Sequence, residues 1–274
     1  MSRAIPRVLA IAGSDSGGGA GIQADLKAFA SRGTYGLSAI TAVTAQNTAG
    51  LQAIHAVPPR IVCAQIESVV EDIGVDAVKI GMLVDAATVR AVARCLSKCL
   101  DAETPIVLDP VLSASTGATL LAADGVEVLL SELFPRVTVL TPNLPEARAL
   151  AAHAGRPPPR AGDDGALARE LLALGPVSVV LTGGHRAQAG DLYCDAEQLV
   201  ELGGEHYDTR ATHGSGCTHS AVLAAELASG RTPLEAARTA AVCAAAAIRD
   251  GLDGLGQGSG PVDALGVWQR ERTS

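Results

Sequence analysis

Ten consecutive residues, Thr212 to Ala221, carry the residue types that a phosphate-binding loop needs. Gly214 and Gly216 flank Ser215, and small apolar residues follow, as at the start of a helix. The free N–H groups of a helix start carry partial positive charge and bind anions, and glycine lets the main chain come close to a bulky anion. The segment therefore predicts an anion-binding loop.

Cys217 falls on the first turn of that helix. A helix N-terminus favours the thiolate, so the position predicts a lowered thiol pKa and a nucleophile or base beside a bound phosphate. These are the parts of a phosphoryl-transfer site. The same residues also fit a loop that only caps a helix, with Cys217 as a small apolar residue. His213 and His219 flank the loop; either could be a base, although a histidine there is more often a cap or packing residue.

A second glycine-rich loop, from Ala12 to Gly21, follows the first predicted strand. Its spacing is not GxGxxG, and no Gly-Lys dipeptide occurs in the chain, which excludes a P-loop. The loop still lies at the carboxyl end of a strand, where open α/β sheets bind ligands. The alternative is a flexible connection into the first helix.

Single polar or soft side chains follow other predicted strands. The Gln46 amide has a donor and an acceptor that could match a heteroaromatic edge, and Met82 could pack on a flat ring or belong to the core. Asp109 and Glu146 could face one crevice and hold Mg²⁺, directly or through water, or each could cap a helix. Thr182 and the glycines after it offer further backbone N–H groups.

These candidate site residues can meet only in a fold that brings the carboxyl ends of the strands together at one edge of a sheet. Short apolar runs alternate with amphipathic segments rich in Ala and Leu. The expected strands are Val8–Ala12, Ser38–Ala45, Ala77–Ile80, Ile106–Leu108, Val137–Leu140 and Val177–Leu181. The expected helices between them are Gly21–Ser31, Pro59–Ile73, Ala86–Cys99, Leu144–Ala152 and Asp164–Leu174. This rhythm predicts βαβ units and a mostly parallel sheet with helices on both faces.

The pattern changes in the last third of the chain. Asp191–Asp195 and Leu199–Glu201 predict a small antiparallel edge. Two helices rich in Ala, His219–Ser229 and Pro233–Arg249, close the fold, with Thr232 as the cap of the second. No boundary divides the chain, so we expect a single α/β domain over residues 1–274.

Composition narrows the function classes. The net charge is −8 without a basic cluster, which argues against nucleic acid and anionic membranes as partners. No secretory signal or apolar run of membrane-spanning length occurs, so we expect a cytoplasmic protein with reduced thiols. Among the six cysteines, Cys95 and Cys99 share a helix face and could be half a metal site. No His or second Cys pair nearby in the sequence completes it, so we predict none there.

Taken together, these segments resemble the hydroxymethylpyrimidine/phosphomethylpyrimidine kinases of thiamine biosynthesis, in the ribokinase-like superfamily. The resemblance covers nearly the whole chain. It is carried, in the family's order, by AGSDSGGGAGIQADLK, TAVTAQNT, KIGML, VLDPV, TPNLPEA, GGH and THGSGCTHSA.

The resemblance implies a role for each of these segments. The implied substrate residues are Gly13, Asp25, Gln46, Met82 and Val111. The implied catalytic residues are Gly214, Ser215, Gly216 and Cys217, the last as base where most ribokinase relatives carry Asp. The implied nucleotide-binding residues are Asn143, Thr182, Gly184 and His213, and Asp109 and Glu146 match the positions for Mg²⁺ and ATP.

The implied reaction is ATP-dependent phosphorylation of 4-amino-5-hydroxymethyl-2-methylpyrimidine to its monophosphate and then to the diphosphate, by a homodimer. The alternatives are a pyridoxal kinase with the same machinery and a non-catalytic pyrimidine-binding protein on the same fold. Two departures from the family concern the nucleotide. Thr182 stands where many members have Lys, and the loop from Leu112 to Gly117 lacks the Lys that many members have there.

Overall fold

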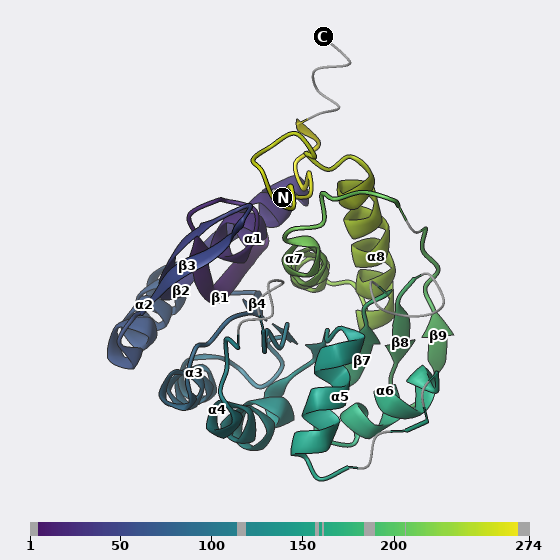
Figure 1. Cartoon of the computed structure of the whole chain (residues 1–274). Coiled ribbons are helices and arrows are strands. Elements are labelled where there is room, and N and C mark those ends of the chain that lie inside the picture. Colours follow the sequence, from purple (N-terminus) through teal and green to yellow (C-terminus); the bar gives the residue numbers. More distant parts are fainter. Residues whose placement is uncertain are drawn as a thin grey trace.

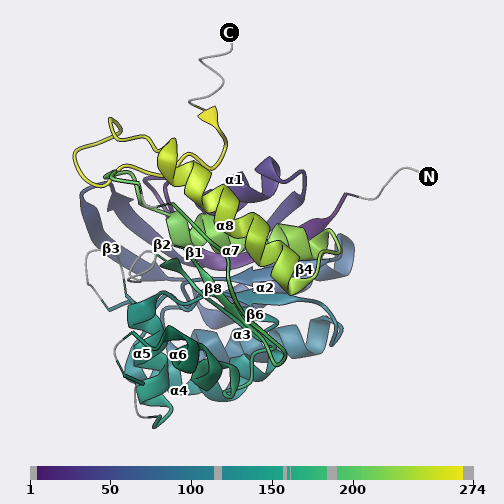
Figure 2. The same ribbon diagram turned by 90° about the vertical axis from the view of Figure 1, so that its right-hand side faces the viewer.

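The computed structural model describes residues 5–113, 119–156, 159–160, 162–183, 190–205 and 207–267. These residues form a nine-stranded sheet between two layers of helices (Figure 1). In Figure 2, α1, α7 and α8 lie above the strands, and α3 to α6 lie below them. The expected α/β class, with helices on both faces of the sheet, is confirmed.

The strands lie in the spatial order β3-β2-β1-β4-β5-β6-β7-β8-β9. Their bounds are β1 Arg7–Asp15, β2 Tyr35–Asn47, β3 Gly50–Ala56, β4 Ala77–Ile80, β5 Ile106–Leu108, β6 Val139–Leu140, β7 Ser178–Leu181, β8 Leu192–Cys194 and β9 Leu199–Glu201. The strands from β2 through β7 in this order pair in parallel, whereas β3 at one edge and β8 and β9 at the other are antiparallel.

The helices are α1 Gly21–Ser31, α2 Pro59–Asp72, α3 Ala86–Cys99, α4 Ala123–Val128, α5 Leu144–His153, α6 Asp164–Leu172, α7 Ser215–Ala228 and α8 Pro233–Arg249. Strand residues alternate between the two layers. Leu9 and Ile11 pack with the apolar faces of α2 to α6, whereas Val8 and Ala10 pack with α1, α7 and α8. The second layer is rich in Ala, which lets α7 and α8 lie close to the sheet and to each other.

Side-chain caps fix several helix starts. Asp85 accepts a hydrogen bond from the Thr88 amide at the start of α3. Reciprocal capping boxes begin α5, through Asn143 and Glu146, and α8, through Thr232 and Glu235. The predicted cap of α8 is therefore confirmed.

Three elements differ from the sequence expectations. The edge strand β3 was not predicted, because most of its side chains are exposed and the buried/polar alternation is missing. The helical segment from Ala123 to Arg136, which includes α4, a π-helical turn and a 3₁₀ turn, was also missed. The helix expected to begin at His219 begins at Ser215, directly after Gly214.

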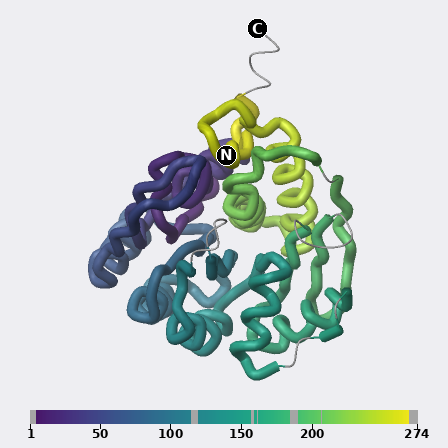
Figure 3. The backbone as a smooth tube through the Cα atoms, in the orientation of Figure 1, coloured from purple at the N-terminus to yellow at the C-terminus, as the bar shows by residue number. Residues whose placement is uncertain are grey.

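The C-terminal loop returns to the N-terminal half of the sheet, as Figure 3 shows in yellow beside purple. The amide of Gly258 donates to the Thr48 hydroxyl, and the His213 amide donates to the Gly260 carbonyl. Loops from three distant parts of the sequence thus meet at one edge of the sheet. Within the described residues, none of the helices combines the length and apolar character needed to cross a bilayer.

Candidate active site

A cleft of about 730 Å³ opens at the carboxyl ends of the parallel strands. Nearly all the predicted site residues line it: Gly13, Gln46, Met82, Asp109, Val111, Asn143, Glu146, Thr182, His213, Gly214, Ser215, Gly216 and Cys217. Gly184 lies outside the described residues. The strand order spreads these groups along the cleft. Gly13 and Gln46 lie near the carboxyl ends of β1 and β2, Met82 follows β4, Asp109 and Glu146 follow β5 and β6, and Thr182 follows β7.

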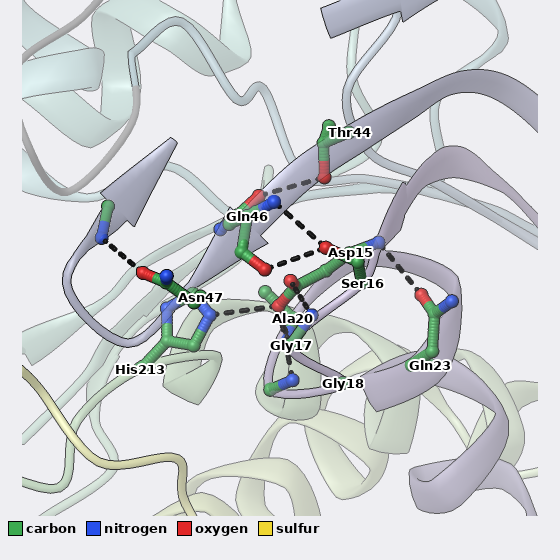
Figure 4. Close-up of polar contacts among 12 residues, drawn as sticks. Asp15, Ser16, Gly17, Gly18, Ala20, Gln23, Thr44, Gln46, Asn47 and His213 are labelled. Atoms are coloured by element: carbon green, nitrogen blue, oxygen red, sulfur yellow. Dashed lines mark hydrogen bonds and ion pairs between the residues drawn. The ribbon is translucent and has the colours of Figure 1, made fainter. Parts of the chain in front are cut away.

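The loop after β1 is organised by the carboxylate of Asp15. Its oxygens accept hydrogen bonds from the amides of Gly17, Gly19 and Ala20 (Figure 4). Nε2 of His213 lies 2.9 Å from Asp15 Oδ2 and joins this loop to the start of α7. Burial would raise the pKa of Asp15, but the hydrogen bonds from His213, Ala20 and Gly17 outweigh it and lower the pKa. The loop is therefore an ordered wall of the cleft and not a flexible connection.

The predicted anion-binding loop begins α7 as expected. Gly214 has a φ of +82° and immediately precedes the helix, so Gly214 to Cys217 present a helix start to the cleft. A Cβ atom on Gly214 would lie 1.8 Å from the carbonyl oxygen of Gly19. The two glycine-rich loops are thus in direct backbone contact, which explains why glycine is needed there.

The expected lowered pKa of Cys217 is wrong for the protein without ligands. Burial raises the pKa of this thiol to about 12; the Lys79 ammonium lowers it, and the carboxylates of Asp109 and Asp25 raise it further. The thiol lines the cleft and is only partly exposed. Cys217 is therefore a neutral thiol at pH 7 in this state, because loss of hydration outweighs the field of the helix start.

Asp25 takes a different place from the one predicted for a substrate residue. It is fully buried, is absent from the wall of the cleft, and forms an ion pair of 2.8 Å with Lys79 Nζ. Burial raises the pKa of Asp25 to about 6, against the opposing effect of Lys79. The carboxylate lies behind Lys79, so in this structure it supports the site through Lys79.

Lys79 is a site residue that the sequence reasoning missed. It is the only lysine or arginine among the described residues that line the cleft. It lies on β4 beside Ala10 of β1. Burial alone would lower the pKa of its ammonium group, but the negative charges of Asp25 and Asp109 outweigh burial and raise it. A signal was available: a lysine inside an otherwise apolar buried strand needs a partner.

Asp109 and Glu146 form the acidic centre of the cleft. Asp109 Oδ2 accepts a hydrogen bond from the Ser220 hydroxyl at 3.1 Å, and Glu146 Oε2 accepts one from the Asn143 amide at 3.0 Å. Burial raises the pKa of both carboxyl groups, and the Asp109 charge helps raise that of Glu146 to about 8. Two buried carboxyl groups that disfavour each other's charge fit a hard divalent cation, and Mg²⁺ is commonly held by one or two carboxylates plus substrate phosphates.

Gln46 and Met82 line the end of the cleft next to β1 and β2. The Thr44 hydroxyl lies 3.2 Å from Gln46 Oε1 and holds this amide at the wall. A Cβ atom on Gly13 would lie 2.3 Å from Met82 Cε, so Gly13 leaves room for the Met82 side chain. Both side chains are therefore positioned by neighbours, Gln46 by Thr44 on the same strand and Met82 by the space that Gly13 leaves.

The other end of the cleft lies near β7 and α8. The Thr182 amide donates to the Pro142 carbonyl, and the Gly183 amide donates to Asp191 Oδ1 at 2.7 Å. His219 is buried, also lines the cleft, and has its Nε2 3.0 Å from Asp191 Oδ2. Small and apolar residues of α8 complete this wall, namely Ala241, Ala244, Ala245 and Ile248.

Known proteins match nearly the whole length of this chain. The family described as phosphomethylpyrimidine kinase matches residues 15–263. A hydroxymethylpyrimidine/phosphomethylpyrimidine kinase of Rhizobium meliloti is 44% identical over 270 residues, which cover 96% of this chain and 98% of that protein.

Solved structures with the same fold include two kinases. The phosphomethylpyrimidine kinase of Clostridium difficile superposes with a TM-score of 0.74 at 38% identity and covers 87% of this chain and 97% of its own. The pyridoxal kinase of Staphylococcus aureus in complex with ADP superposes with a TM-score of 0.86 at 32% identity and covers 98% of this chain and 96% of its own. With the cleft described above, these matches show that the chain belongs to the phosphomethylpyrimidine kinase family and is a phosphotransferase.

Proposed function

We propose that this chain, acting as one domain, phosphorylates 4-amino-5-hydroxymethyl-2-methylpyrimidine with ATP and then phosphorylates the monophosphate to the diphosphate. One observation carries the proposal: a single cleft is lined by Gln46 and Met82, by the helix start at Gly214, and by the buried carboxyl groups of Asp109 and Glu146. The strand order, with β2 and β1 on one side, β5 and β6 next and β7 beyond them, supports an order of pyrimidine, phosphates and nucleotide along the cleft.

Different residues of the cleft bind the ring, bind the phosphoryl group and supply positive charge. The Gln46 amide pairs with the ring edge, and Met82 and Val111 pack on its faces. The amides from Gly214 to Cys217 bind the transferring phosphoryl group and stabilise its charge, and one such donor is worth about 10²–10³-fold in rate. Lys79 supplies positive charge next to that group, which matters because Thr182 offers none.

Asp109 and Glu146 would hold Mg²⁺ with the phosphates of ATP. When bound, the ion supplies charge neutralisation between phosphate oxygens. Asn143 holds Glu146 in place through its cap contact at the start of α5. His213 holds the loop after β1 in place through its contact with Asp15.

The two steps make different demands on the protein. An alcohol is a poor nucleophile, so the first step gains from a base, for which Cys217 is the group beside the anion loop. The phosphate of the monophosphate is already an anion near neutral pH, with a second pKa of about 6, so the second step needs no base.

A pyridoxal kinase is the second candidate, because pyridoxal kinase structures superpose with TM-scores of 0.84 and 0.86. The deciding experiment incubates the protein with Mg-ATP and, separately, the pyrimidine alcohol, its monophosphate or pyridoxal, and resolves the phosphorylated products. We expect monophosphate and then diphosphate from the pyrimidine. A much higher kcat/KM for pyridoxal would decide for the second candidate.

Replacing Gln46 with methionine is expected to raise the KM for the pyrimidine alcohol about tenfold or more, because a bidentate amide contact is lost while the side-chain volume is kept. ATP hydrolysis without the pyrimidine is expected to stay nearly the same. Steady-state kinetics measures the KM for the pyrimidine alcohol and the rate of ATP hydrolysis separately. An unchanged KM for the pyrimidine would remove Gln46 as the residue that recognises the ring.

Replacing Gly214 with alanine is expected to lower the free energy of unfolding by at least about 1–2 kcal/mol, the cost of a left-handed L-residue, and to slow both phosphorylation steps. The reason is the contact that its Cβ would make with Gly19. Thermal unfolding and product formation measure the two effects. Gly230 to alanine is the matched control, since Gly230 has the same left-handed φ, +83°, and a Cβ there meets no atom within 4 Å. If the two variants behaved alike, the loop contact would be unimportant.

We also propose that the protein is a cytoplasmic homodimer, as the family resemblance implies. Large apolar side chains on β2 and β3, Val43 and Ile54, are 50% and 40% exposed and are available for such a contact. Sedimentation equilibrium of the purified protein tests the assembly.

A further inference from the structure

Three potential metal ligands meet between α2 and α3, outside the cleft: Glu67 of α2 with Cys95 and Cys99 of α3. Cys63 of α2 lies beside them, because its carbonyl accepts a hydrogen bond from the Cys95 thiol. These four residues are here called the thiol cluster. None of the four lines the cleft. The sequence showed only the pair on α3, because the other pair lies on a different helix that packs against it.

The spacing within each helix explains the convergence. Residues four apart lie on the same face of a helix, and both pairs have this spacing. The faces of α2 and α3 meet over the sheet, where Val62 and Leu96 next to the cluster are fully or nearly fully buried. Two such pairs on facing helices bring side chains of both helices to one place, as in metal sites built between helices.

The distances suit a metal ion. Ligand atoms of Glu67, Cys95 and Cys99 all lie within 4.8 Å of one another, and the Cys95 and Cys99 sulfurs are 3.9 Å apart. A tetrahedral zinc site with Zn–S bonds of about 2.3 Å places two sulfurs about 3.8 Å apart. Cys63 lies beside this group and not within it: its carbonyl lies 3.8 Å from the Cys95 sulfur, and its own thiol donates a hydrogen bond to the Ala91 carbonyl at 3.4 Å.

The cluster is also reachable from solvent. Cys95 is 4% exposed, whereas Cys63, Cys99 and Glu67 are half-buried at the edge of the helix pair. Because only Cys95 is buried and the other three side chains are partly exposed, a cation can enter without unfolding α2 or α3. The donors are three soft sulfurs and one carboxylate, a set that selects a thiophilic ion over Mg²⁺ or Ca²⁺.

We propose that the thiol cluster binds one thiophilic divalent cation of the Zn²⁺ class, with the Cys95 and Cys99 thiolates and the Glu67 carboxylate as ligands and with the Cys63 thiolate, turned away from the Ala91 carbonyl, as the fourth. Binding releases the thiol protons to solvent and needs no oxidant or reductant. The site ties α2 to α3 and is independent of the phosphorylation reaction.

Lys98 allows a variant for which the proposal predicts tighter metal binding. Its Nζ lies 3.2 Å from Glu67 Oε1, and the lysine side chain is 76% exposed. In the metal-free protein this ammonium occupies a carboxylate oxygen that a cation would use. Lys98→Met therefore removes a competitor and is expected to tighten Zn²⁺ binding about two- to tenfold, whereas loss of a purely structural contact would not.

The experiment titrates the full-length protein, reduced with a phosphine, with Co²⁺ and then with competing Zn²⁺. We expect one equivalent of Co²⁺ to give an intense thiolate-to-metal charge-transfer band that Zn²⁺ abolishes. Cys95→Ala and Cys99→Ala should each weaken binding by more than the roughly 10–100-fold typical of an outer-shell partner. Glu67→Gln should weaken metal binding less and keep the charge-transfer band. Because it leaves all cysteines in place, it tests the site even if a cysteine variant fails to fold.

Two controls separate this site from other thiols. Cys243→Ala removes a half-buried cysteine of α8 and should change nothing. Cys217→Ala removes the thiol of the cleft and should keep the band. The proposal is overturned by the absence of a stoichiometric charge-transfer band, by a band that persists in both Cys95→Ala and Cys99→Ala, or by a band that is lost with Cys217.

Discussion

Replacing Cys217 with alanine is expected to slow phosphorylation of the pyrimidine alcohol by about 10²–10⁴-fold, the usual contribution of a positioned base. Phosphorylation of the monophosphate is expected to fall far less, because its nucleophile is already ionised. Cys217 is the thiol at the start of α7, and it lines the cleft next to the amides of the anion loop. Single-turnover rates of the two steps, measured separately with saturating Mg-ATP, give the ratio.

The pH profile provides an independent check. Because the pKa of the Cys217 thiol is raised to about 12, the thiolate fraction grows with pH throughout the neutral and mildly alkaline range. The first step should therefore continue to accelerate above pH 7, while the second levels off once the phosphate, with a pKa of about 6, is ionised. Equal losses in both steps on replacement by alanine would exclude a base role and leave Cys217 a part of the anion loop.

Replacing Lys79 with methionine is expected to lower the free energy of unfolding by about 3–5 kcal/mol, because it leaves the Asp25 carboxylate buried without its partner. Both side chains of this pair are completely inaccessible, and their charged atoms are 2.8 Å apart. Denaturant unfolding measures the loss. Phosphoryl transfer should fall as well, because Lys79 is the only lysine or arginine among the described residues that line the cleft.

A double variant separates these two effects. Lys79→Met combined with Asp25→Leu replaces a buried ion pair by apolar side chains, a change that is often neutral for stability. We expect most of the lost stability to return and the activity to stay low. Recovery of activity along with stability would show that the Lys79 charge takes no part in catalysis. Wild-type stability of the single variant would show that the pair carries no buried charge.

The strand-and-loop plan of the site could be predicted from the sequence. Buried parallel strands are continuous apolar runs, and Gln46, Asp109 and Glu146 all come directly after such runs or just beyond them. The topology rule then places their side chains at one edge of the sheet. The helix start at Gly214 was readable for the same reason, since glycine and small residues mark it locally.

Contacts between distant segments could not be predicted in this way. Lys79 inside an apolar strand signals that a partner is needed, but only the structure shows that this partner is Asp25 of α1. The pKa of Cys217 depends on burial and on carboxylates from two other elements, so the local helix start gave the wrong direction. Likewise, Cys95 and Cys99 looked incomplete until α2 brought Cys63 and Glu67 beside them.

The layering of the fold has a consequence for how the chain matures on the ribosome. Val8, Ala10, Val107 and Val180 lie on the sheet face that α7 and α8 cover, together with α1. Those two helices are translated after all nine of the described strands. The apolar face of the sheet therefore stays exposed until α7 and α8 have been made. Nascent chains of this protein should therefore be most prone to aggregate just before residues 215–249 emerge.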